Sequence, residues 1–581
     1  RKIQNNTAMQ IIKSLLKLLI FICPVFFISQ STYLNQGVKD TRFVERLEIK
    51  QQTNTNLNFS TLRPFNRKAI VRQAEFLDSA RMGYADSTGR DKYWEWTDLD
   101  LSRIDEYNLR SFLMNNTEWV TVPRADFNSK KMLFKTFYKT KSNFIEVKRN
   151  DLFLAINPVL QITQAIEPGY NKAVFLNSRG ITARGLIAKK IGFSALITDN
   201  QERGPQFFQQ RVNQFKAVPG NGFYKPFKTT GVDYFDARGY ITFAAVKNYV
   251  DVQFGYDKNF IGNGYRSLFL SDWGNSNLFL KLNTKIWKFN YQNLFMELMP
   301  QFKKGGDTLL DRKYAAMHHL SMNVTKWLNI GLFEGVIFGR KNRFDFQYLN
   351  PLIFYRHIES NNGSKDNAIA GLDFKANIAH RAQFYGQFLL DEFILSEIKN
   401  NPTSWVNKWG IQAGIKYVDA FGIRNLDVQV ETNRVRPFTY SHTDTVANYT
   451  HYNQPLAHPL GANFQEVLAI INFQPAPKWY ISAKAIYYYQ GLDSAGQNFG
   501  SNPMRKNSDR SMSSGFKIGS GNKATCLNSM LQVSYEWKEN LYFDISYQYR
   551  NYKIANIAGQ SNTSLITAGV RLNMFKRDYD F

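Results

Sequence analysis

Three groups of aromatic and cationic side chains stand close together in the chain and could bind a ligand. Aromatic rings stack on the faces of sugars, and the planar fork of arginine contacts a carboxylate with two parallel hydrogen bonds. This combination predicts binding of an acidic sugar, with ordinary loop packing and anchoring as the alternative. The candidate ligand-binding residues are Tyr265, Arg266 and Trp273; Tyr355 and Arg356; and Arg434, Arg436 and Tyr440.

Other site chemistry has little support in the sequence. The histidines show no i, i+4 pairing, and segment 361–367 has too few acidic residues for a calcium loop. Phosphate loops (Gly-Lys-Ser/Thr) and nucleophile elbows (Gly-x-Ser-x-Gly) are both missing from the sequence. With Cys23 in an apolar leader, Cys526 remains alone and no disulfide framework is expected. We therefore expect no metal site, no cofactor and no enzymatic activity, although a Ser/His hydrolase with distant partners stays open.

The charge of the chain limits the kinds of partner that we expect it to bind. Its formal net charge is +26, and the cationic residues are spread along the chain without a basic tail or a nucleic-acid motif. This distribution favours acidic surface polysaccharide and lipopolysaccharide phosphate over nucleic acid. Outer-membrane lipid is the other expected partner.

The first thirty residues are typical of an export signal. Lys13 and Lys17 precede an apolar run over 18–28, which is too short to span a bilayer. We interpret 9–30 as a cleaved Sec signal peptide and 1–8 as sequence upstream of the start. The protein is thus predicted to cross the inner membrane of a Gram-negative bacterium.

A small N-terminal segment, residues 31–130, is expected to be periplasmic and partly helical. Residues 32 to about 60 are polar and predicted to be loosely ordered. Apolar residues at helical spacing predict helices over 69–82 and 101–113. A partly ordered linker is the alternative for residues 61–125.

From residue 131 to 581 the hydrophobic period changes to two. In 541–550, for example, Leu541, Phe543 and Ile545 alternate with polar residues, so a strand here has one oily and one wet face. Short connections alternate with long ones, as in outer-membrane barrels. Counting strands from about residue 151 predicts eighteen, within about two, because 132–147 could add a hairpin. The fold class is therefore an all-β transmembrane barrel with short periplasmic turns and long external loops, and a large soluble all-β protein is the alternative.

The strand pattern also predicts what fills the barrel. Charges of both signs should face the lumen, forming a salt-bridged interior or, alternatively, an ion-selective pore. The segment 262–272 is apolar enough, with Leu268, Phe269 and Leu270, that it could fold inward instead of forming an external loop. The predicted lumen-facing charges are Asp373, Lys375, Asp427, Glu431, Lys484, Glu536, Asp544, Arg550 and Arg571.

Several segments resemble a known family. The segment 262–272 (GNGYRSLFLSD), followed by 278–297, resembles the Wzi-like capsule-assembly family, as do 350–356 (NPLIFYR), 371–375 and 385–393. More narrowly, the chain resembles the branch of gliding bacteria that contains RemB. The resemblance implies an eighteen-stranded outer-membrane barrel, a small helical element at its periplasmic mouth and a lectin-like role toward capsular polysaccharide. No site residues carry over from it.

The predicted function is binding or organising capsular or surface polysaccharide at the outer membrane, with a possible link to gliding motility. A diffusion porin or substrate-specific channel is the alternative, and an outer-membrane hydrolase is a third hypothesis.

Overall fold

The structure is a computed structural model, and it describes residues 31–34, 39–53, 55–81, 99–122, 124–130, 132–134, 136–302, 309–352, 354–361, 363, 366–392, 395–555 and 561–581. The predicted signal peptide, 9–30, and the segment before it lie outside the described residues. None of the described helices is both long and apolar enough to cross a membrane.

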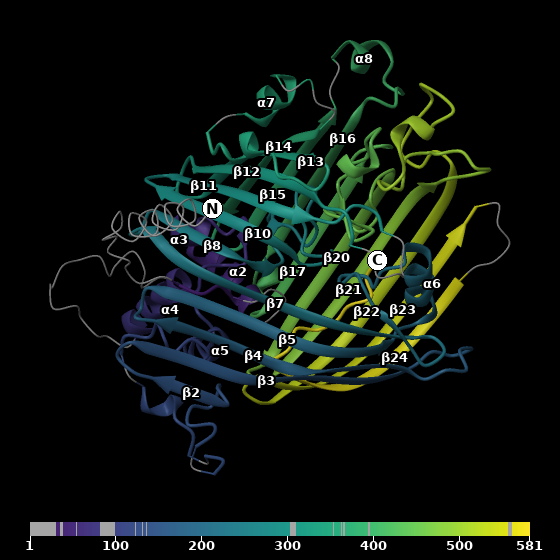
Figure 1. The fold of residues 1–581 in the computed structure, drawn as a ribbon. Coiled ribbons are helices and arrows are strands. Elements are labelled where there is room, and N and C mark those ends of the chain that lie inside the picture. The colour runs from purple at the N-terminus through teal and green to yellow at the C-terminus, as the bar shows by residue number, and fades with distance from the viewer. Residues whose placement is uncertain are drawn as a thin grey trace, which may run out of the picture.

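A closed antiparallel barrel of eighteen long strands makes up most of the described chain (Figure 1). Each strand pairs with its neighbours in sequence, and β24 pairs with β3 to close the wall. Closure satisfies every strand edge, as a sheet in lipid requires. The strands are β3 (Leu152–Ile166), β4 (Val174–Ile187), β5 (Ile191–Arg203), β7 (Gly231–Val246), β8 (Val250–Asp257), β10 (Asn277–Ile286), β11 (Phe289–Leu298), β12 (Lys313–Asn323), β13 (Leu328–Phe338), β14 (Asn367–Ile378), β15 (Ala382–Glu392), β16 (Lys408–Tyr417), β17 (Leu426–Val435), β20 (Phe464–Ala476), β21 (Trp479–Leu492), β22 (Asn522–Lys538), β23 (Leu541–Ile554) and β24 (Ser561–Leu572).

Six short strands accompany the wall. β2 (Ile145–Lys148) pairs with β3, so 132–147 supplies one short strand at the barrel edge instead of a full hairpin. β6 (Lys225–Phe227) pairs with β7, β18 (Thr450–His451) with β19 (Gln454–Pro455), and β1 (Leu62–Arg63) with β9 (Phe260–Ile261). The last pair joins the N-terminal segment to a segment that follows β8.

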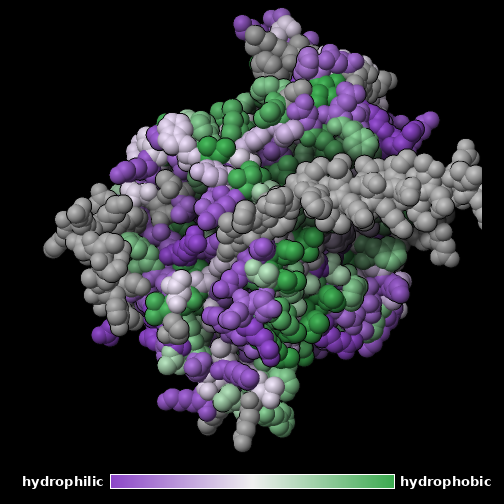
Figure 2. Space-filling view, turned by 60° about the vertical axis from the view of Figure 1, so that its left-hand side comes forward, coloured by the Kyte–Doolittle hydropathy of each residue, from purple (hydrophilic) through white to green (hydrophobic). Residues whose placement is uncertain are grey.

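The alternation of side chains confirms the predicted strand faces. In β23, Phe543, Ile545 and Tyr547 are exposed on the outer face, whereas Tyr542 and Asp544 are buried on the inner face. Figure 2 shows hydrophobic side chains gathered in areas of the visible face, with hydrophilic ones around them. In this strand the outer face is therefore apolar and the inner face largely polar.

The connections confirm the predicted alternation of short turns and long loops. At one end, tight turns join β4 to β5 and β14 to β15, and Ala379 and His380 take left-handed backbone angles (φ 54° and 55°) in the latter. Two such residues in a hairpin turn match the right-handed twist of the flanking strands. We call this the short-turn end, and the opposite one the long-loop end.

Helices gather at the short-turn end (Figure 1). The predicted helices over 69–82 and 101–113 are confirmed by α4 (Arg67–Arg81) and α5 (Arg103–Met114), and Ser102 caps α5 with a capping box. The prediction that 32–60 is loosely ordered is wrong, because α2 (Lys39–Gln51) and α3 (Thr55–Asn58) form there. Helix α2 packs Phe43, Val44 and Leu47 in the core of the N-terminal segment, whereas its charged residues, such as Arg46 and Glu48, are held by partners in the barrel.

The remaining helices belong to the connections between strands. They are α6 (Gln206–Phe215), α7 (Tyr355–Asn361) and α8 (Leu395–Asn400), with single 3-10 turns η1 (Ala125–Phe127), η2 (Phe346–Leu349), η3 (Ala420–Gly422), η4 (Thr445–Ala447) and η5 (Asn507–Asp509).

Candidate ligand cavity in the lumen

Helix α2 lies in the barrel mouth at the short-turn end and is tied to the wall by ion pairs. Arg46 reaches both Asp427 at the start of β17 and Asp419 in the adjoining turn. Lys39 pairs with Glu536 of β22 at 2.7 Å. The charged residues of α2 can be buried here because the wall supplies opposite charges in place of water.

The segment 262–272 folds into the lumen, as the alternative prediction held, instead of forming an external loop. Its backbone N–H groups are satisfied by wall side chains: Tyr265 N and Arg266 N donate to Glu431 at 2.7 and 3.1 Å. Leu268 N donates to Gln387 at 2.8 Å. An irregular segment can lie inside the barrel because these side chains replace water as acceptors. We call residues 262–272 the inward segment.

Behind the inward segment, one side of the lumen is a packed apolar core. Leu268, Phe269 and Leu270 are buried against lumen-facing residues of β10–β13 such as Phe333, whose ring stacks on Phe269 at 4.5 Å. Residues of the connection between β17 and β20, including Tyr449, complete this core. The lumen is therefore closed on this side.

The residues after β24 also enter the lumen. The last strand ends at Leu572, and Asn573 takes a left-handed conformation (φ 50°) that turns the chain inward. Residues 574–581, the C-terminal tail, then follow the wall toward the long-loop end, where Phe581 packs beside Phe207 of α6. Figure 1 shows the C-terminus within the barrel near α6.

Charges of the tail meet charges of the wall and of the inward segment. Lys484 of β21 contacts Asp578 at 2.7 Å and Asp580 at 3.2 Å, and it donates to the Tyr265 hydroxyl at 2.7 Å. Arg266 donates to the Asp580 carbonyl at 2.6 Å. The tail thus supplies the carboxylates that keep these cations from being buried without partners.

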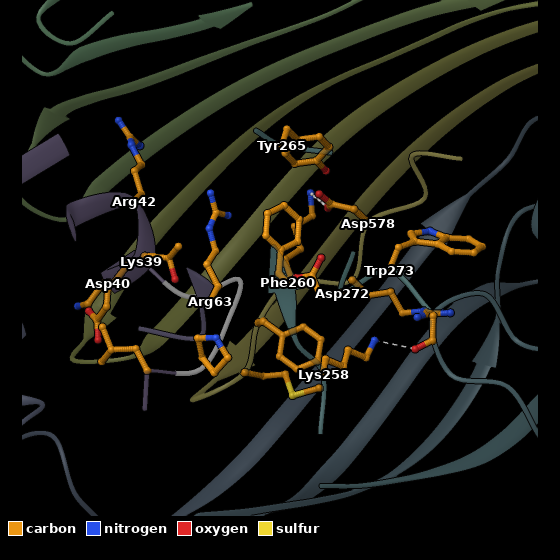
Figure 3. Close-up of a pocket in the computed structure, with 18 of the residues that line it drawn as sticks. Lys39, Asp40, Arg42, Arg63, Lys258, Phe260, Tyr265, Asp272, Trp273 and Asp578 are labelled. Carbon is orange, nitrogen blue, oxygen red and sulfur yellow. Dashed lines mark hydrogen bonds and ion pairs between the residues drawn. The ribbon is translucent and has the colours of Figure 1, made fainter. Parts of the chain in front are cut away.

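A cavity of about 630 Å³ remains between these parts, on the side of β4–β8 and β20–β24 (Figure 3). It extends from α2 to the 219–221 and 271–273 segments at the long-loop end. Ligand sites commonly have volumes of about 300–1,000 Å³, so an oligosaccharide fragment can be accommodated. The aromatic residues that line it are Tyr33, Phe43, Tyr234, Tyr240, Phe260, Tyr265, Trp273, Tyr480, Tyr542, Phe575 and Phe581.

The cavity also offers charged groups near the long-loop end. Lys258 follows β8 and donates to the Gly220 carbonyl at 2.8 Å, while Asp272 and Trp273 lie near it in Figure 3. Burial, reinforced by the positive charge of Arg238, lowers the pKa of Lys258 to about 7. Cations and aromatic rings that line one cavity suit an acidic sugar, because a ring can cover the apolar face of the sugar while a cation meets its carboxylate.

The candidate ligand-binding residues from the sequence fall into different environments. Tyr265, Arg266 and Trp273 line the cavity. Tyr355 is fully buried, and Arg356 is exposed and pairs with Glu359 in α7. The first group therefore comes together in one place, but inside the barrel and not on an external loop.

The third predicted group has packing roles at the long-loop end. Arg434 faces outward from β17 and lies 5.9 Å from the Trp409 ring. Arg436 is buried and donates to three backbone carbonyls, those of Ser404, Asn407 and Phe516. Tyr440 is buried and donates to the Leu268 carbonyl at 2.8 Å. Arg436 and Tyr440 therefore hold connections together at this end of the barrel.

The predicted lumen-facing charges are confirmed inside the barrel, and most of them are paired, whereas Arg550 packs on the rings of Phe207 and Tyr552. Lys375 meets Glu48 at 2.6 Å, Asp373 meets His319 at 2.7 Å and Asp544 meets Arg571 at 2.9 Å. Sequence reasoning did not anticipate Lys258 or the C-terminal tail as parts of a site. The dense charges of 576–580 (Lys-Arg-Asp-Tyr-Asp) were the available signal, because such a run is poorly suited to a strand with a lipid-facing side. The described residues contain no cluster of His, Cys, Asp or Glu that could hold a metal ion.

A closed eighteen-stranded wall, apolar outside and paired by charge inside, defines an outer-membrane β-barrel of Gram-negative bacteria with an occupied lumen. The family model of capsule assembly protein Wzi matches residues 237–565, which is more than half of the chain. The chain therefore belongs to the Wzi capsule-assembly family.

One solved structure agrees with this fold. Wzi of Escherichia coli, an outer-membrane protein involved in group 1 capsule assembly and described as a carbohydrate-binding β-barrel, has a TM-score of 0.54. It is 12% identical, and the match covers 94% of this chain and 100% of that one. OprD of Pseudomonas aeruginosa is 11% identical, with a TM-score of 0.41 and coverage of 72% and 95%. No protein with a curated description matches the chain in sequence.

Proposed function

We propose that the protein binds acidic surface polysaccharide and helps to hold capsule at the cell surface, without enzymatic activity. The observation that carries the proposal is the lumenal cavity, where Tyr265, Arg266, Trp273 and Lys258 bring aromatic faces and cations together. Membership of the Wzi family supports the same substrate class. In this proposal the long-loop end faces the exterior and the helices at the short-turn end are periplasmic.

Binding to purified acidic capsular oligosaccharides tests the proposal. We expect Trp273→Ala to weaken binding about 5- to 150-fold, since stacking of a ligand ring on one aromatic side chain contributes about 1–3 kcal/mol where bases stack on such rings. Trp537→Ala is the matched control, because Trp537 is half-exposed on the outer wall and away from the cavity. Equal affinity in both variants would place the site elsewhere, and unchanged capsule retention in a deletion strain would refute the function.

A diffusion porin is the second candidate, and the filled lumen argues against it. α2, the inward segment and the C-terminal tail occupy the space that a porin of this strand number leaves open. We expect almost no steady current in planar bilayers. A stable conductance of porin size would favour the channel. The link to gliding motility remains a prediction, and surface spreading of a deletion strain tests it.

A further inference from the structure

The long connection between β13 and β14 does not extend away from the barrel but folds down along its outer face. Tyr348, Tyr355 and Ile358 pack on outward-facing residues of β11–β13, among them Phe295 and Val336. In Figure 1, α7 lies outside the wall beside β14. We call the described residues of 339–361 the outer flap.

The outer flap covers polar groups that would otherwise face hydrocarbon. Asn293, His318 and Glu334 are cross-strand neighbours on the outer face of β11, β12 and β13. The Tyr355 ring lies 4.0 Å from the His318 ring, and Arg356 N donates to Glu334 at 3.1 Å. Polar side chains on the lipid face of a barrel are destabilising. The flap shields these three polar residues from lipid by packing protein groups against them.

The flap reaches well below the long-loop rim. At the rim, the Tyr314 hydroxyl donates to the Asn342 carbonyl at 3.0 Å. Farther down, the Tyr291 hydroxyl donates to the Pro351 carbonyl, and Tyr291 lies seven residues from the rim end of β11. At ~3.3 Å per residue and a tilt of ~40°, this is about 18 Å of depth, compared with an apolar band about 25 Å tall.

Two kinds of exposed side chain occupy different depths of the flap. Leu352 and Phe354, which flank the deep contact at Pro351, are 85% and 75% exposed, and Phe346, which lies nearer the rim beside Phe344, is 78% exposed. Lys341 and Arg343 follow the end of β13 at the rim, and their side chains make no ion pair within the described part of the chain. Apolar groups below and cations above match the vertical order of acyl chains and phosphates in a phosphorylated glycolipid.

We propose that the outer flap is embedded in the outer leaflet and binds a phosphorylated glycolipid, lipopolysaccharide, at the barrel wall. Lys341 and Arg343 contact the phosphates of its lipid A portion, and Phe346, Leu352 and Phe354 contact its acyl chains. This site is separate from the lumenal cavity and does not depend on the proposed polysaccharide binding.

The depth of the flap is tested by a spin label at Leu352→Cys in lipopolysaccharide-containing vesicles. We expect high accessibility to oxygen and low accessibility to a water-soluble nickel complex. Ile545→Cys on the outer wall is the lipid-exposed reference, and Ser511→Cys in the loop between β21 and β22 is the aqueous one. Cys526 is buried and gives little background label. A label at 352 that behaves like the one at 511 would overturn the proposal.

The headgroup is tested by affinity for lipid A in detergent. We expect the double variant Lys341→Ala/Arg343→Ala to bind lipid A about 10- to 30-fold more weakly, as expected for loss of two cations at an anionic surface. The control, Lys399→Ala/Lys517→Ala, removes the same charge from two other long loops and should leave binding unchanged. Dephosphorylated lipid A should bind the parent and the double variant equally. Equal loss in both double variants would show a general charge effect and refute the assigned site.

Discussion

Glu431 organises the inward segment, and its replacement is predicted to release that segment while leaving the barrel folded. Its carboxylate accepts hydrogen bonds from Tyr265 N at 2.7 Å, Arg266 N at 3.1 Å, the Tyr385 hydroxyl at 2.9 Å and Asn433 Nδ2 at 2.8 Å. Glu431→Ala leaves the two backbone donors buried without acceptors. At about 1–3 kcal/mol for each orphaned donor, the segment should lose about 2–6 kcal/mol of local stability.

Hydrogen exchange followed by mass spectrometry measures this loss directly. Since every 1.4 kcal/mol is a factor of ten, protection of peptide 262–270 should fall about 30-fold to 10⁴-fold. Glu431→Gln keeps one carbonyl acceptor and turns an amide nitrogen toward the other donor, so its effect should be about 5- to 100-fold. Peptides of β21–β23 should exchange at the parent rate, because opening of a segment within the lumen is local.

Two outcomes would refute this reasoning. Parent-like exchange of 262–270 in Glu431→Ala would show that the carboxylate does not hold the segment. Uniform acceleration over all strands would show that Glu431 stabilises the wall instead. Glu297→Ala serves as a control, because Glu297 lies at the rim in a partly exposed pair with Arg312, and such pairs contribute about 0–1 kcal/mol.

Three further predictions concern other parts of the molecule. Arg436→Ala should make the connections at 395–407 and 493–521 at least tenfold more sensitive to protease, because three backbone carbonyls lose their donor. Arg434 faces outward, so Arg434→Ala should not change the cleavage rate. Equal cleavage of both variants would show that Arg436 does not hold the two connections together. Ile545→Lys should lower the free energy of unfolding in phospholipid vesicles by about 2–4 kcal/mol, whereas an unchanged urea midpoint would mean that Ile545 does not face hydrocarbon. Affinity for an acidic oligosaccharide should fall as pH rises from 6 to 8, because Lys258, with a pKa of about 7, loses its charge. Lys258→Arg keeps the positive charge over this range, so its affinity should change little with pH. The same change of affinity with pH in both proteins would exclude Lys258 from the site.

The strands were predictable because their signal is local. In β23 each residue faces either lipid or the lumen, so apolar and polar residues alternate over 541–550 with a period of two. The helices α4 and α5 were predictable for the same reason, since each has an apolar stripe that packs within the N-terminal segment. Helix α2 was not, because its apolar residues are interrupted by Arg46, Glu48 and Lys50, which are buried against charges far along the chain such as Asp427, Lys375 and Asp419.

The candidate site was predictable only in its composition. Tyr265, Arg266 and Trp273 were identified as a group that could bind a sugar, but their placement in the lumen depends on acceptors such as Glu431 that lie more than 150 residues away. Arg436 and Tyr440 have the same residue types and hold loops together instead. Residue type therefore indicated possible chemistry and could not separate ligand contacts from packing.

The sequence by itself determined a cylinder of antiparallel strands, its approximate strand number and its alternation of short and long connections, because each of these follows from the period and spacing of neighbouring residues. Only the tertiary structure decided what fills that cylinder and what covers it: α2, the inward segment and the C-terminal tail inside, and the outer flap outside. These parts are irregular or polar, so they take their positions from hydrogen bonds and ion pairs with strands far along the chain. No local pattern in the sequence records such partners.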